Sequence, residues 1–106
     1  MPAITHLQFL VLGMLRAEPQ LGRTVRRELT RHGVRRSGPA FYQMMSRLED
    51  AGLVAGEYDQ KVIGGQIIKE RRYTLTPAGA AAWNATRDFY LASIAAFQPE
   101  RGLSRA

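Results

Sequence analysis

The 106-residue sequence contains no cysteine, which excludes a disulfide framework, a thiolate nucleophile and any cysteine-based zinc site. It also has no apolar run near the roughly 20 residues that a membrane span requires, and no secretory signal at its start. We therefore expect a cytoplasmic protein that is stabilised by packing and by dimerisation. The length leaves little room for a second independent core, so one globular domain is the working count.

Histidine is scarce as well, with His6 and His32 as the only two in the chain. No Ser-His-Asp set can be assembled from them, and the sequence has neither a glycine-rich phosphate loop nor acidic residues at metal-ligand spacing. We therefore predict a protein that is not an enzyme and that uses no cofactor and no metal. His6 is expected at the surface of the first helical turn, and His32 at a helix end.

What the sequence has in excess is positive charge, since 15 Lys and Arg against 9 Asp and Glu give a net charge of +6. A basic balance favours a polyanionic partner such as nucleic acid. Seven arginines lie between residues 16 and 36, against the two acids Glu18 and Glu28. Such a run is typical either of a solvated helix face or of a nucleic-acid surface, and charge alone leaves both interpretations open.

Helical and extended periodicities follow one another in a defined order. Capping signals mark helix starts at Thr5, at Ser37 and at Thr76. The predicted helices span about 5–17, 21–32, 37–51 and 77–97, and the predicted strands span 53–59 and 71–75 around a Gly64–Gly65 turn. This order predicts a mostly helical α+β protein with a small β-hairpin, a winged helix-turn-helix whose third helix enters the major groove of DNA.

The same order predicts three parts. Residues 1–75 form a winged helix-turn-helix DNA-binding domain, residues 76–98 a C-terminal dimerisation helix, and residues 99–106 a flexible tail. A two-residue loop in the hairpin would place Glu57 opposite Arg72, which is favourable, but Asp59 opposite Glu70, which is not. The register therefore stays open, although we expect Arg72 to pair with Glu57.

The third helix carries the residues that are predicted to read DNA. Its apolar residues Phe41, Met45 and Leu48 recur at helical spacing and are expected inward, which leaves these outward: Ala40, Gln43, Met44, Ser46 and Arg47. Gln43 suits adenine or a phosphate, and Arg47 suits guanine or a phosphate. The competing interpretation for Arg47 is an intrahelical ion pair with Asp50.

Basic residues flank the start of this helix. Arg35 and Arg36 precede it, where they would meet phosphates beside the groove or belong to a solvated loop. The helix N-terminus near Ser37 and Gly38 favours an anionic oxygen. We therefore predict that all four residues contact DNA.

The hairpin offers a second basic region. Lys61 and Lys69 lie near its tip, where a wing reaches the next backbone or the minor groove, and are predicted to contact DNA. The tip is apolar, with Val62, Ile63, Ile67 and Ile68 around the two glycines. This pattern indicates either a partner contact or two longer strands that pack on themselves.

A seam of large apolar residues runs along the last helix at spacings of seven, four and three, and consists of Trp83, Tyr90, Ile94 and Phe97. Such a seam packs on another helix, in the same chain or in a second copy. Because a domain of this size has little room to bury it beside the stripe of the first helix, we predict a homodimer.

Two stretches resemble the PadR-like family of transcriptional regulators: residues 37–54, SGPAFYQMMSRLEDAGLV, and residues 71–79, RRYTLTPAG. That family has a Gly-Thr-Leu-Tyr stretch, an Arg-Leu-Glu triplet, a Gly-Leu-Val step into the wing and an Arg-Tyr-Tyr-x-Leu-Thr return strand. The matching positions are Phe41, Tyr42, Arg47, Leu48, Glu49, Gly52, Leu53, Val54, Tyr73, Leu75, Thr76 and Gly79. The resemblance covers most of the chain.

The resemblance implies a sequence-specific regulator of transcription that uses the third helix and the wing on double-stranded operator DNA and dimerises through its first and last helices. It implies Tyr42 as a phosphate contact, with a buried supporting tyrosine as the competing interpretation. It also allows release by a hydrophobic small-molecule effector bound at the dimer interface against Trp83, Phe89 or Tyr90.

Some positions depart from the family pattern. Pro39 and Ala40 stand where the family has Gly and Thr, so the hydroxyl that would bind a phosphate is missing, and Arg23 replaces an aromatic residue after Gly22. The leading hypothesis is a repressor whose dimer binds a pseudo-palindromic operator with half-sites roughly 34 Å apart. The alternative is a winged-helix module that binds an acidic protein or RNA without specific DNA binding.

Overall fold

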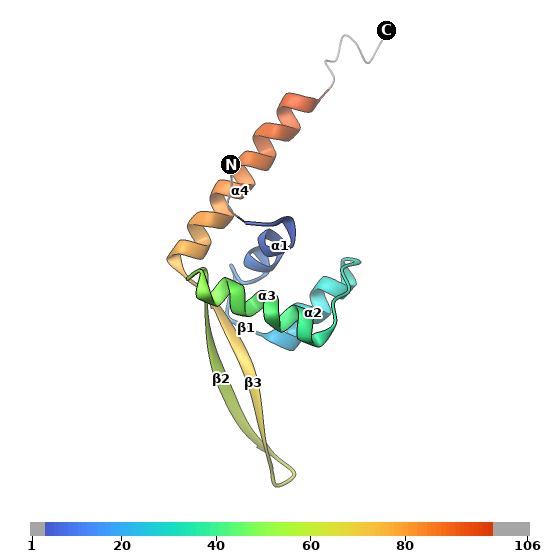
Figure 1. The fold of residues 1–106 in the computed structure, drawn as a ribbon, viewed down its shortest axis with the longest axis vertical. Helices are drawn as coiled ribbons and strands as arrows, with labels where there is room; N and C mark the ends of the chain where they lie inside the picture. The colour runs from blue at the N-terminus through green and yellow to red at the C-terminus, as the bar shows by residue number, and fades with distance from the viewer. Residues whose placement is uncertain (1–3, 99–106) are drawn as a thin grey trace.

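The computed structural model describes residues 4–98. The elements follow in the order α1 (His6–Met14), β1 (Gln20–Leu21), α2 (Gly22–Arg31), α3 (Gly38–Asp50), β2 (Val54–Ile63), β3 (Gln66–Leu75) and α4 (Pro77–Phe97). Helices α1 to α3 form a body from which the β2–β3 hairpin and α4 extend in opposite directions (Figure 1). The predicted α+β winged-helix class is confirmed. No helix of the described residues is long and apolar enough to cross a membrane, and the tail predicted at 99–106 lies outside them.

The helix starts are those that the capping signals predict. The Thr5 hydroxyl accepts from the Gln8 amide at 3.1 Å, and the Gln8 side chain accepts from the Thr5 amide at 3.0 Å, which completes a capping box. The hydroxyls of Ser37 and Thr76 accept from the amides of Ala40 and Gly79 and so cap α3 and α4. Helix α1 ends at Met14, before the predicted residue 17, and the Gln20 side chain donates to the Met14 carbonyl, one of the acceptors left free at that helix end.

The core lies where α1, α2, α3 and the base of the hairpin meet. Its buried residues are Val11, Leu12, Leu15, Val25, Leu29, Phe41, Met45, Leu48, Val54 and Tyr73. The residues predicted inward on α3 are all in this set, but the prediction that Met44 points outward is wrong. Met44 packs half-buried against the core, because the apolar stripe of a core-facing helix is wider than one row of residues.

The hairpin has the two-residue loop that Gly64 and Gly65 predict. Both have positive φ, 57° and 81°, which is the backbone of the tight turns that join twisted antiparallel strands. The strands reach Ile63 and Gln66, so they are longer than predicted. A two-residue strand, β1, pairs with the other edge of β3 and gives the sheet order β1-β3-β2.

The register places Glu57 opposite Arg72 and Asp59 opposite Glu70. The prediction that Arg72 forms an ion pair with Glu57 is nevertheless wrong. Arg72 instead binds Asp59 diagonally, with Nε donating to Oδ2 at 2.7 Å, and this hydrogen bond lowers the pKa of Asp59. Glu70 binds Arg23 of α2 at 2.7 Å. The unfavourable Asp59–Glu70 juxtaposition is relieved because each acid has its own arginine.

Candidate nucleic-acid interface

The outward face of α3 is the centre of the candidate site. Its exposed residues are Pro39, Ala40, Tyr42, Gln43, Ser46, Arg47 and Asp50. Within residues 4–98 no ion pair includes Arg47 or Asp50, so the competing intrahelical pair does not form. The Arg47 guanidinium is therefore exposed on this face, with no acidic partner among the described residues. Ser46, Gln43 and Ala40 complete a face of small or hydrogen-bonding groups, which suits base edges.

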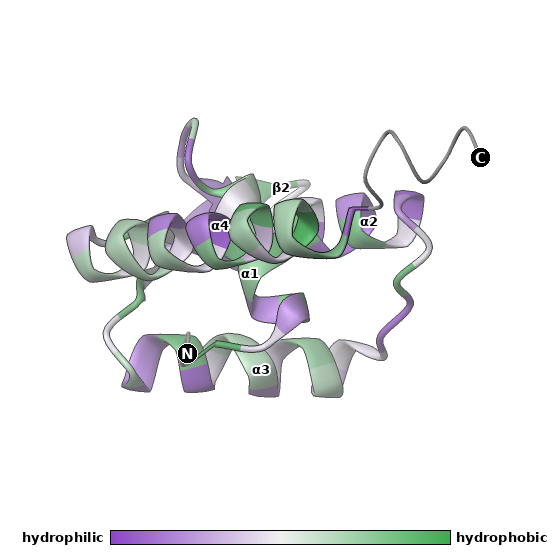
Figure 2. Ribbon diagram, turned by 90° about the horizontal axis from the view of Figure 1, so that it is seen from above, coloured by the Kyte–Doolittle hydropathy of each residue, from purple (hydrophilic) through white to green (hydrophobic). Residues whose placement is uncertain are grey.

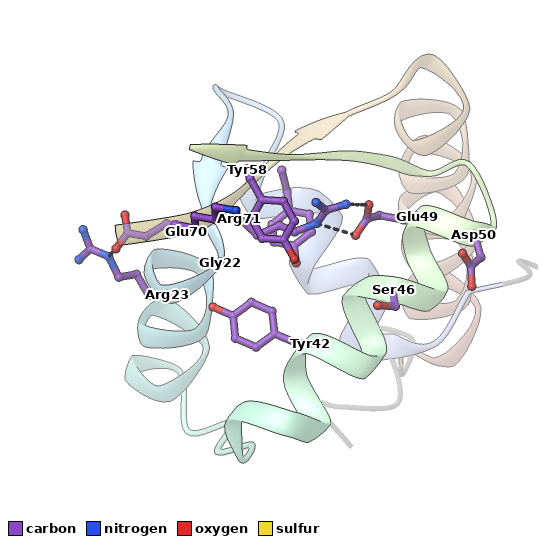
Figure 3. Close-up of a pocket in the computed structure, with 11 residues that line it drawn as sticks. Gly22, Arg23, Tyr42, Ser46, Glu49, Asp50, Tyr58, Glu70 and Arg71 are labelled. Carbon is purple, nitrogen blue, oxygen red and sulfur yellow. Dashed lines mark hydrogen bonds and ion pairs between the residues drawn. The ribbon is translucent and has the colours of Figure 1, made fainter. Parts of the chain in front are cut away.

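Tyr42 links α3 to the start of α2. Its ring lies edge-on to Phe41 at 5.0 Å between centroids, and a Cβ atom on Gly22 would come within 2.9 Å of its hydroxyl oxygen. Figure 3 shows the ring pointing from α3 toward Gly22 and Arg23. Tyr42 therefore supports the packing of α2 on α3 and is still 39% exposed.

A hollow of about 370 Å³ lies between α2 and the loop that precedes α3. We call it the arginine hollow, because its lining is Arg23, Arg26, Arg27, Thr30, Arg35, Arg36 and Tyr42. No acidic side chain lines it. The Arg26 Nε atom donates to the Arg36 carbonyl at 3.0 Å, so the loop is tied to α2. Such a concentration of guanidinium groups is suited to phosphate.

Sequence reasoning missed part of this hollow. It placed Arg35, Arg36 and Tyr42 in the site but not Arg26, Arg27 or Thr30. The available signal was spacing, since residues 23, 26, 27 and 30 share one face of a helix. Arg31 lies elsewhere and pairs with Glu28 at 3.0 Å.

On the other side of α3, a cleft of about 660 Å³ separates the helix from the hairpin (Figure 3). Arg71 of β3 spans it, donating to both carboxylate oxygens of Glu49 on α3 and lying 4.6 Å from the Tyr58 ring centroid. The hydrogen bond that Arg71 donates to Glu49 raises the pKa of Arg71. Gly56 lies close to this pair, since a Cβ atom there would lie 2.5 Å from Glu49 Oε1 and would displace the two side chains. The Glu49–Arg71 pair therefore fixes the base of the wing to α3.

Lys61 and Lys69 are exposed beyond this base, and no ion pair of the described residues includes either. Because Lys69 is paired with Gln60 and side chains alternate along a strand, the two lysines lie on opposite faces of the hairpin. Both strands reach the tip, as one of the two interpretations predicts, but the packing of the strands on themselves is not seen, because Val62, Ile63 and Ile67 stay exposed.

The predicted seam of α4 divides into two halves. The Trp83 ring stacks on Phe9 of α1 at 5.5 Å with 12° between the planes, and the Arg16 guanidinium covers it at 3.8 Å. Tyr90 lies edge-on to the same Phe9 at 5.4 Å. A Cβ atom on Gly13 would come within 2.9 Å of the Trp83 indole nitrogen, so α1 and α4 approach closely here. The first half of the seam is thus packed within the chain.

The second half of α4 is uncovered within residues 4–98. Leu91, Ile94 and Phe97 are 58%, 57% and 85% exposed, and Phe89 is 41% exposed. Seen from above in Figure 2, the part of α4 nearest the C-terminal tail is coloured mainly hydrophobic. Helix α1 cannot cover it, because α1 is about 14 Å long and α4 about 31 Å at 1.5 Å per residue.

Comparisons with known proteins agree with this geometry. Residues 11–85 match the family model described as the transcriptional regulator PadR-like family. A transcriptional regulator of Mycobacterium tuberculosis is 41% identical over 66 residues, which cover 62% of this chain and 58% of that protein, so the match spans less than two thirds of the relative's length.

Two solved structures share the fold. A PadR family regulator from Eggerthella lenta superposes with a TM-score of 0.71 at 29% identity, over 85% of this chain and 76% of that one. Bacillus subtilis PadR, solved in complex with operator DNA, superposes with a TM-score of 0.65 at 20% identity, over 76% of this chain and 46% of that one.

Proposed function

We propose that this chain, which belongs to the PadR-like family of transcriptional regulators, represses transcription by binding a pseudo-palindromic operator as a homodimer. One observation carries the proposal. The exposed face of α3 lies close to two groups of basic side chains: the arginine hollow, which Tyr42 of α3 also lines, and the hairpin, whose Lys69 lines the cleft along α3. A helix that reads bases needs phosphate contacts on both sides to fix its register on the duplex.

Within this proposal, Gln43 and Arg47 contact base edges or the adjacent phosphates, and Arg35, Arg36, Lys61 and Lys69 contact phosphates. Ala40 offers only its methyl group, because its amide already donates to the Ser37 hydroxyl at 3.2 Å. That methyl suits the methyl group of thymine. Pro39 has no amide hydrogen, so Gly38 and Ser37 supply the backbone donors at this helix end.

The arginine hollow offers phosphate contacts in place of the threonine hydroxyl that the family has and this chain lacks. Where the family pattern has Thr, this chain has Ala40, but the Tyr42 hydroxyl and the guanidinium groups of α2 lie beside the same helix start. Guanidinium groups bind phosphate in bidentate fashion and more strongly than a neutral hydroxyl does. We therefore add Arg26 and Arg27 to the predicted phosphate contacts.

The homodimer is supported by the uncovered half of α4. Leu91, Ile94 and Phe97 present a continuous apolar surface that a second copy of the helix would bury. Dimerisation would double every DNA contact and set two α3 helices about one helical turn, roughly 34 Å, apart. The effector site stays a prediction, because Trp83 and Tyr90 already contact α1 and only Phe89 is exposed.

Selection from a random duplex library, followed by binding titrations at several salt concentrations, tests the proposal. We expect enrichment of an inverted repeat and a steep fall in affinity with salt, since phosphate neutralisation releases counterions. The matched RNA duplex and an acidic polypeptide are the competing probes. If either binds as tightly as the best DNA and no repeat is enriched, the interaction-module alternative is correct.

A further inference from the structure

The end of the hairpin, residues 60–69, combines exposed aliphatic side chains with two lysines, and we call it the wing tip. We propose that the wing tip acts as an apolar wedge in the minor groove next to the major groove that α3 occupies, and that it bends the operator there. This inference rests on the proposed function. It adds a role in DNA deformation, and with it a preference for deformable base steps that the protein does not read through hydrogen bonds.

The aliphatic side chains lie on both faces of the tip. Val62 is paired with Ile67 on one face, and Ile63 and Ile68 lie on the other. Val62, Ile63 and Ile67 are 71%, 58% and 63% exposed, so the fold itself gains little from them. An exposed apolar strand end is also an aggregation hazard, so its presence calls for a partner that covers it.

Charge identifies that partner as a polyanion. The wing tip contains Lys61 and Lys69, one on each face, and no acidic residue. The nearest acids, Asp59 and Glu70, are each held by an arginine. A second wing tip would be repelled by the same charges, whereas the minor groove presents a phosphate backbone on each side of an apolar wedge.

The reach of the hairpin fits this groove. Arg23 of α2 holds the hairpin at Glu70, which is paired with Asp59, and the Glu49–Arg71 pair lies one residue closer to the base. From Asp59 to Gly64 the strand advances five residues, so at about 3.3 Å per residue the tip extends roughly 17 Å beyond this attachment. The minor groove next to an occupied major groove is half a helical turn away, about 17 Å.

The width of the tip explains why the DNA must deform. A B-form minor groove is about 6 Å wide, whereas a ribbon with side chains on both faces needs nearer 10 Å. Apolar side chains that enter such a groove unstack base steps and kink the duplex toward the major groove. Pyrimidine–purine steps such as TA deform most easily, so we expect them beside each half-site.

Two matched double variants separate the apolar from the ionic contribution. Val62→Thr with Ile67→Thr keeps β-branched side chains of similar shape but makes the face polar, whereas Lys61→Gln with Lys69→Gln removes only the charges. The probe is a duplex of roughly four helical turns, taken from the library selection and labelled at both ends for energy transfer. It is made in two versions, with TA or with AA as the step that faces the wing tip.

We expect the native protein to bend the TA duplex and to prefer it to the AA duplex by roughly tenfold. The threonine variant should lose most of the bend and this preference, with an unchanged unfolding temperature, because the tip is exposed. The glutamine variant should keep the bend while its log–log salt slope falls by about four units per dimer.

A native complex without a bend, or a threonine variant that bends DNA as the native protein does, would overturn the wedge while leaving the proposed function standing. Failure of the native protein to bind any duplex would remove both.

Discussion

The two basic regions beside α3 differ in shape and in chemistry. The arginine hollow is concave, and Arg26 is held in place by the Arg36 carbonyl. The wing tip is convex and carries lysines among aliphatic side chains, and its hairpin is held to α3 by the Glu49–Arg71 pair and to α2 by the Arg23–Glu70 pair. Guanidinium groups donate in a planar, directional array, whereas an ammonium group is a flexible point charge. The hollow is therefore suited to fixing the register of the backbone, and the wing tip to following a duplex that deforms.

The largest expected effect comes from a change that separates the dimer, because each monomer would then bring only one copy of each basic region to the DNA. Ile94→Asp places a charge in the exposed apolar half of α4, which costs several kcal/mol in a buried interface. We expect a monomer at micromolar concentration and a loss of operator affinity of about a thousandfold, measured by sedimentation and by anisotropy. Asn84→Asp, which adds the same charge to an exposed position of the same helix, is the control. A native chain that sediments as a monomer would refute the dimer.

The next change acts on one region alone. Arg26→Ala with Arg27→Ala empties part of the arginine hollow and should weaken binding about a hundredfold on every duplex, since phosphate contacts carry no sequence information. Arg31→Ala is the matched control, because that arginine pairs with Glu28 outside the hollow. Equal affinities for the two variants would mean that the hollow does not bind the backbone.

A smaller effect, confined to one base position, is expected from a change on α3 itself. Arg47→Ala should cost about 1 to 3 kcal/mol of binding free energy and relax the preference at one base position of each half-site. Its readout is a repeat of the library selection with the variant. If the selected sequence is unchanged, Arg47 contacts a phosphate and not a base.

The smallest expected effect is on stability and concerns Tyr42, the side chain that lines both the hollow and the cleft. Tyr42 lines both, and Gly22→Ala would bring a methyl group within 2.9 Å of its hydroxyl oxygen and 3.1 Å of the buried Tyr73 ring. Overpacking of this kind costs about 1 to 3 kcal/mol of unfolding free energy, and we expect the low end because the Tyr42 ring can move. In Gly38→Ala the new methyl would meet its nearest atom at 3.5 Å, so its denaturant midpoint should match the native one.

Much of the fold could be predicted from the sequence, because it depends on short-range signals. The capping residues Thr5, Ser37 and Thr76 mark three helix starts, and the Gly64–Gly65 pair marks the turn. Strand β1 could not be predicted, since two residues show no periodicity and its pairing with β3 depends on the tertiary fold. The Arg72–Asp59 ion pair could not be predicted either, because a diagonal partner competes with the directly opposite one.

The candidate site was less predictable, because its parts come from separate elements. The spacing of α2 indicates a basic face, but only the fold brings that face to Arg35 and Arg36 and so makes a hollow. The spacing of the apolar residues predicted the seam of α4, but it did not predict that one half of the seam is packed within the chain and the other half is exposed. Which half is covered depends on where Phe9 of α1 meets Trp83 and Tyr90.

The slope of log affinity against log salt concentration for the native protein on its selected duplex tests the DNA-binding proposal most directly. One phosphate for each of Arg35, Arg36, Lys61 and Lys69 in two chains predicts a slope of roughly −7, and the added contacts of Arg26 and Arg27 would steepen it to about −11. We therefore expect a value in this range. A slope near zero would contradict phosphate neutralisation by the two basic regions and would leave them to some other partner.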